Sequence, residues 1–162
     1  MRKTVIALSV VGVVLAVIVG VLSYLLFGGH VKPGAEGRLE ISLPAGERAV
    51  VLKEMRDLLA AVQAIVAAAT RDDPVAIAAA ARPLGMQAAQ HVEVALEAKL
   101  PMDFLKRGRD LHQDFDRIAD DAERRKDTRR SLVLLGETLN KCVACHAAYA
   151  LVPAASGTPA AR

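Results

Sequence analysis

Two cysteines and a histidine lie close together near the carboxyl end of this 162-residue chain, in the segment Cys142-Val143-Ala144-Cys145-His146. Side chains of these types at this spacing can bind a cofactor or a metal ion. The sequence contains no other cysteine. C-x-x-C-H is the attachment signature of a c-type haem. Its two thiols form thioether bonds to the haem, and the adjacent imidazole ligates the iron. The motif therefore predicts one covalently attached haem c, with His146 as an axial iron ligand.

Other kinds of site also use closely spaced cysteines. A structural zinc site normally has four Cys or His ligands, and this motif offers at most three within reach. A thioredoxin-like redox pair belongs in a βαβ setting, which the sequence does not predict. A disulfide between Cys142 and Cys145 on one helix would have poor geometry. These alternatives stay open beside haem attachment, which the motif favours.

The elements that would position this motif are helices, because apolar residues recur at steps of three and four. Asp73-Pro74 predicts a helix start with Asp73 as N-cap, and Pro83 is expected to kink the helix that follows. Four amphipathic stretches with short connections favour an all-α fold, an antiparallel four-helix bundle. The stretches run over about 47–69, 74–99, 104–122 and 129–149.

The last of these stretches carries the motif on its apolar stripe. The stripe steps by three and four through Leu132, Leu135, Leu139, Cys142, His146 and Tyr149. Residues at these spacings share one face of a helix. We therefore expect this face to point into the bundle and the haem to lie inside it.

The N-terminal part of the chain contains a long uncharged segment. Residues 5–27 carry no charge and follow Arg2 and Lys3. As a helix they would span roughly 34 Å, against roughly 30 Å of membrane hydrocarbon. With the positive-inside rule this predicts a transmembrane helix, a single-pass inner-membrane location and a haem domain in the periplasm. A cleaved signal peptide is the alternative.

The predicted domain organisation follows from these segments. Residues 1–27 form the anchor or signal peptide, and 28–46, with their Gly and Pro, form a linker. Residues 47–151 form the haem-binding four-helix bundle, and 152–162 form a disordered tail. The chain has 21 basic and 18 acidic residues, and no basic patch is interleaved with aromatics. It is therefore not expected to bind nucleic acid. No motif of an enzyme stands out.

The C-terminal CxxCH, followed by the pattern HxxY from His146 to Tyr149 and closing a four-helix chain, resembles the class II c-type cytochromes, the cytochrome c′ group. The resemblance covers roughly residues 47–151, and its last helix carries the specific part. It implies a bundle that holds one haem. In low-spin members a Met of the first helix ligates the iron opposite the His, and Met55 has the matching position. In this family a basic residue often follows the Tyr directly. In this chain that position is Ala150.

The sixth iron ligand decides the expected function. The expected haem-binding residues are Cys142, Cys145, His146 and Met55. If Met55 is the sixth ligand, the protein is expected to be an electron-transfer cytochrome. Its partners would be membrane redox proteins or soluble periplasmic electron carriers, and a homodimer is left open. Met86 is an alternative ligand. With the site empty, the haem would instead be five-coordinate and bind nitric oxide or carbon monoxide.

The remaining basic side chains near the predicted bundle are given no iron-binding role. His91 and His112 are interpreted as boundary or surface histidines rather than ligands. Arg48 lies one heptad before Met55. It is interpreted as a solvated charge, with a haem propionate contact as the alternative.

Overall fold

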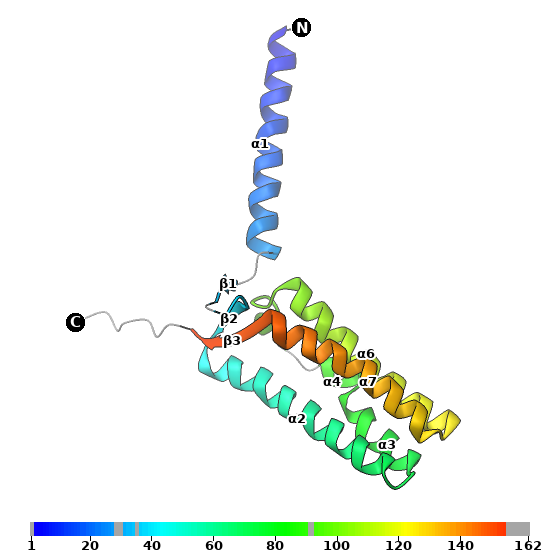
Figure 1. Cartoon of the computed structure of the whole chain (residues 1–162). Helices are drawn as coiled ribbons and strands as arrows, with labels where there is room; N and C mark the ends of the chain where they lie inside the picture. Colours follow the sequence, from blue (N-terminus) through cyan, green and yellow to red (C-terminus); the bar gives the residue numbers. More distant parts are fainter. Residues whose placement is uncertain (1, 28–30, 35, 91–92, 155–162) are drawn as a thin grey trace, which may run out of the picture.

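The computed structural model describes residues 2–27, 31–34, 36–90 and 93–154. Most of these residues are helical, and short strands gather at one end of the molecule (Figure 1). The elements in chain order are α1 (Arg2–Phe27), β1 (Val31–Pro33), β2 (Leu39–Leu43), α2 (Ala45–Ala69), α3 (Pro74–Ala81), the 3₁₀ helix η1 (Arg82–Leu84), α4 (Met86–Ala89), α5 (Val94–Glu97), α6 (Met102–Arg125), α7 (Thr128–Ala148) and β3 (Tyr149–Pro153).

Helix α1 projects away from the rest of the molecule (Figure 1). Among the described residues, no helix is both long enough and apolar enough to span a membrane. This finding contradicts the predicted transmembrane helix and, with it, the single-pass inner-membrane location.

The long helices begin and end where local sequence signals place them. Helix α3 begins with Pro74, and the carboxylate of Asp73 accepts a hydrogen bond from the backbone N–H of Ala76 at 2.9 Å. Helix α6 ends at Lys126, which takes the left-handed conformation at φ 54°. Asp127 then caps α7 by accepting from the N–H of Arg130 at 3.0 Å. The predicted N-cap at Asp73 is confirmed.

The predicted second helix, residues 74–99, is interrupted rather than continuous. It consists of α3, η1, α4 and α5, with residues 91–92 outside the described part. Pro83 lies in η1, because its ring and missing N–H break the α-helical hydrogen-bond ladder. Gly85 then adopts an extended conformation, at φ −71° and ψ −170°, before α4 begins. The proline therefore ends the helix instead of kinking it.

The segment predicted as a linker contains two strands. Strand β2 pairs antiparallel with β1 and parallel with β3, so that Leu39 lies opposite Tyr149 and Leu43 opposite Pro153. Apolar and polar residues alternate along Leu39–Leu43, which is the pattern of a strand with one buried face. Ile41 and Leu43 are fully buried. The sheet thus joins the chain before α2 to the chain after α7.

The predicted fold class is therefore corrected. The described chain forms a helical domain with a small sheet, and the all-α four-helix bundle behind a transmembrane helix is contradicted. Most of the tail that we predicted to be disordered lies outside the described residues. Its first residues, Val152 and Pro153, belong to β3.

The buried apolar side chains of the described chain form two clusters. The larger one packs α2, α3, α6 and α7 together around Ile65, Phe115 and Ile118. The smaller one lies at the sheet end and contains Ile41, Leu43, Val51, Leu96 and Leu100. The larger cluster thus packs α2 against α7, and the smaller one packs the first half of α2 against the sheet.

Removing the cap of α3 should destabilise the fold measurably. In Asp73→Ala the N–H of Ala76 loses its acceptor, and the expected cost is about 1 kcal/mol in the free energy of unfolding. Urea unfolding followed by circular dichroism measures this change. Glu137→Ala, at an exposed position of α7, is the control and should change stability by less than about 0.5 kcal/mol. Equal effects of the two variants would contradict the capping role.

Candidate functional site

The carboxyl end of α7 is anchored on two sides. After Ala148 the chain leaves the helix at Tyr149, and β3 runs along β2. The phenol O–H of Tyr149 donates to Oδ2 of Asp103 at 3.0 Å, and its ring meets that of Phe104 edge-on at 5.5 Å. Arg107 donates to the same carboxylate at 2.7 Å. The last turns of α7, which carry the cysteines and His146, are thereby fixed against α6 and the sheet.

The motif residues differ in exposure along these turns. Cys142 and Cys145 are half-buried free thiols, whereas the His146 side chain is exposed. Burial raises the pKa of both thiols above their ordinary value, so both are protonated at neutral pH. A neutral thiol is a poor nucleophile and a poor metal ligand. The pair therefore lacks the thiolate character of a reactive redox pair.

The buried face of α7 is turned relative to the predicted stripe. Ser131, Leu134, Leu135 and Thr138 are buried, whereas Leu132 and Leu139 are 42% and 38% exposed. Of the predicted stripe, Leu135 is buried, and Cys142 and Tyr149 are half-buried. The side of α7 that carries Leu139 and His146 is therefore left partly uncovered by the polypeptide.

A cavity of about 500 Å³ lies at this end of α7. His146 and Cys145 line it from α7, Met55 lines it from α2, and Phe104 lines it from α6. The full set of lining residues is Gly34, Glu36, Arg38, Glu40, Leu52, Met55, Phe104, Cys145, His146, Tyr149, Ala150, Leu151 and Val152. The fold thus brings together Met55, Cys145 and His146, which lie far apart in the sequence.

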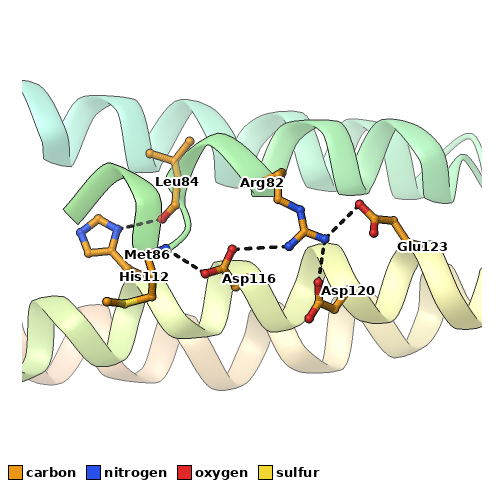
Figure 2. Close-up of polar contacts among 7 residues, drawn as sticks. All are labelled: Arg82, Leu84, Met86, His112, Asp116, Asp120 and Glu123. Carbon is orange, nitrogen blue, oxygen red and sulfur yellow. Dashed lines mark hydrogen bonds and ion pairs between the residues drawn. The ribbon is translucent and has the colours of Figure 1, made fainter. Parts of the chain in front are cut away.

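The other methionine weighed as a ligand lies elsewhere. Met86 begins α4, and its backbone N–H donates to Oδ2 of Asp116 at 2.8 Å (Figure 2). It is not among the residues that line the cavity. Met55, in contrast, is half-buried and packs against the smaller core cluster. Of the two, Met55 is the thioether that shares a cavity with His146.

Sequence reasoning missed several residues of the cavity wall. Gly34, Glu36, Arg38 and Glu40 come from the hairpin of β1 and β2, and Arg38 forms an ion pair with Glu36. The alternation in Leu39–Leu43 was the signal that could have identified this strand. Arg48 is half-buried and donates to the carbonyl of Leu151 at 3.2 Å, so it ties α2 to β3. It is not among the residues that line the cavity.

The residues present fit a haem c. The cavity volume falls in the range of small-molecule and cofactor sites, about 300–1,000 Å³. Its wall is largely apolar and includes an aromatic ring, Phe104, as a flat macrocycle requires. The imidazole of His146 faces open volume rather than packed side chains. Cys142 and Cys145 would hold the group covalently, and His146 and Met55 are the side chains able to ligate its iron.

In the described part of the chain, no group of three or more His, Cys, Asp or Glu side chains is placed to hold a metal ion. No family model, no curated protein and no solved structure matches the chain.

His112 is buried, which corrects its interpretation as a boundary or surface histidine; His91 lies outside the described residues. Nε2 of His112 is 2.9 Å from Oε1 of Glu54, and Nδ1 is 2.8 Å from the carbonyl oxygen of Leu84. The hydrogen bond to Glu54 raises the pKa of His112, and burial opposes this effect. Asp116 on α6 adds a smaller effect that also raises it.

The raised pKa makes stability depend on pH. His112 should contribute fully to the free energy of unfolding below its unfolded pKa of about 6.5. This contribution should be lost as the pH rises through the higher pKa of the folded state. Urea unfolding between about pH 6 and pH 9 should show this decline. Glu54→Gln removes the carboxylate and should flatten it. A decline that is equally steep in both proteins would contradict the role of this pair.

Proposed function

We propose that the protein is a mono-haem c-type cytochrome that transfers electrons. Cys142 and Cys145 are the attachment points for haem c, and His146 and Met55 are its axial ligands. Its partners are redox proteins that donate electrons to it or accept them from it.

The observation that supports this proposal most strongly is the composition of the cavity. The C-x-x-C-H motif supplies Cys145 and His146 to a wall that also contains Met55. His146 is exposed, so its ring is accessible to a bound iron. The thioether of Met55 is neutral and soft, and such a ligand favours ferrous iron.

Each of these side chains has a distinct task. His146 would hold the iron from α7, and Met55 would hold it from α2. Phe104, Leu52 and Leu151 supply apolar parts of the cavity wall. The bound haem supplies the one-electron exchange between ferric and ferrous iron. Fixed ligands on packed helices keep the reorganisation between these two states small.

Met55 also supports electron transfer over gas binding. A five-coordinate haem that takes nitric oxide or carbon monoxide needs an open position opposite its histidine. A thioether, that of Met55, lines the same cavity as His146 and would be available as a second ligand. The electron-transfer proposal therefore gives Met55 an iron-binding role, whereas under gas binding Met55 would only pack against the smaller core cluster.

Absorption spectra of the ferric and ferrous protein test the proposal. The protein is produced in a host with a haem-maturation system. We expect a low-spin spectrum in both states, a weak sulfur-to-iron charge-transfer band in the ferric state and slow binding of carbon monoxide. A high-spin spectrum with rapid carbon monoxide binding would overturn electron transfer in favour of the gas-binding function.

A further inference from the structure

A contact between a buried histidine and a half-buried carboxylate lies immediately beside the proposed methionine ligand. His112 of α6 is only 5% exposed, and Nε2 of its ring is 2.9 Å from the carboxylate of Glu54 on α2. Glu54 is the residue directly before Met55. The other ring nitrogen of His112 is 2.8 Å from the carbonyl oxygen of Leu84 in η1. One imidazole thus connects α2, α6 and η1.

The partners of this ring define its state. A carboxylate and a carbonyl oxygen both accept hydrogen bonds, and a neutral imidazole has a single N–H to donate. Both ring nitrogens of His112 can donate to these acceptors together when the ring carries both protons. Hydrogen bonds between charged groups are shorter, stronger and more directional than neutral ones. The pair therefore fixes the position of Glu54 more firmly than an apolar contact would.

The backbone acceptor of His112 is itself held rigidly (Figure 2). Just before Leu84, Arg82 pairs with Asp120 at 2.7 Å and Glu123 at 3.0 Å. Just after it, the N–H of Met86 donates to Asp116 at 2.8 Å. A Cβ added at Gly85 would lie 2.0 Å from the Asp116 carboxylate, so this close approach requires glycine. Leu84 is thus held between two contacts with α6.

Helix geometry carries the effect from Glu54 to Met55. Successive residues of an α-helix are separated by about 100° around its axis, so holding Glu54 towards α6 sets the direction of Met55. Other polar contacts that tie α2 to its surroundings include Glu47–Lys99 at 2.5 Å and Arg48–Leu151 at 3.2 Å. Both lie nearer the start of α2. The pair Glu54–His112 is the tie adjacent to Met55.

We propose that Glu54 and His112 are positioning residues that set the rotation of α2 and so hold Met55 in the cavity as an iron ligand. This inference rests on the proposed function. His112 does not touch the iron; it acts through Glu54 and the helix backbone.

Three variants of the haem-loaded, full-length protein test the proposal. Glu54→Ala removes the tie. Glu54→Gln keeps an acceptor of the same length, and so should retain the position of Met55. Asp57→Ala is the matched control, because Asp57 is an acid two residues after Met55 whose partner, Lys53, belongs to the same helix. Far-ultraviolet circular dichroism establishes that each variant is folded.

For Glu54→Ala we expect the sulfur-to-iron band to weaken and carbon monoxide to bind the ferrous protein about tenfold faster, equivalent to about 1.4 kcal/mol. Glu54→Gln should restore most of the band, and Asp57→Ala should resemble the wild type. If the wild type has the band and folded Glu54→Ala keeps it unchanged, the positioning role is overturned while the function stands. If the wild type lacks the band, the ligation by Met55 and the positioning role both fail.

Discussion

Met55→Ala should convert a low-spin haem into a high-spin one. Alanine has no thioether to bind the iron, so the position opposite His146 opens. The ferric protein should lose its sulfur-to-iron band, and the ferrous protein should bind carbon monoxide readily. The reduction potential should fall, because methionine ligation raises it. Absorption spectra, carbon monoxide titration and a redox titration measure these changes.

Met86→Ala is the control for this result. Met86 lies outside the cavity lining and is half-buried, so its loss should leave the spectrum unchanged. It should cost less than the about 2–5 kcal/mol typical of a fully buried methionine. If Met86→Ala abolishes the band and Met55→Ala retains it, the ligand has been assigned to the wrong methionine.

Replacing both cysteines should abolish covalent attachment. In the double variant Cys142→Ala/Cys145→Ala no thiol remains in the chain to form a thioether bond. We expect the haem to be extracted completely by acidified acetone, whereas the wild type retains it. Each single variant should keep one bond and so attach haem in lower yield. Pyridine haemochrome spectra of the extracted protein quantify the retained haem.

His146→Ala separates attachment from ligation. Both thiols remain, so the haem should stay covalently bound while its spectrum changes. Haem that stays bound in the double cysteine variant under denaturing conditions would contradict attachment through these residues.

Much of the helical framework is predictable from local sequence. The spacing of apolar residues identifies the long helices, and Asp73-Pro74 marks a helix start that the structure confirms. The motif and Met55 were also identified, and the fold brings Met55, Cys145 and His146 to one cavity. These features depend on interactions within a few residues, or on residue types that are rare in the chain.

The sheet depends on long-range pairing, which local patterns do not reveal. Leu39 pairs with Tyr149, which follows it in the sequence only after helices α2 to α7. The strand Leu39–Leu43 lies within a stretch rich in Gly and Pro, so its alternation was overlooked. This omission matters for the site, because the hairpin supplies Arg38 and Glu40 to the cavity wall.

The orientation of α7 could not be read from hydropathy either. Polar residues occupy its buried face: Ser131 donates to the carbonyl of Asp127 at 3.2 Å, and Thr138 to that of Leu134 at 2.9 Å. Because these hydroxyls are satisfied within the helix, burial costs them little. His112 illustrates the same limit, since its burial depends on Glu54 from another helix. Hydropathy assigns such residues to the surface.

The measurement that tests the central claim most directly is the intact mass of the denatured protein. The chain is produced in a host with a haem-maturation system and freed of non-covalent ligands. The account predicts the mass of the 17.2 kDa polypeptide plus one haem, with the added mass on the peptide that contains Cys142 and Cys145. A mass equal to that of the bare polypeptide, under conditions in which a control cytochrome is fully matured, would contradict it.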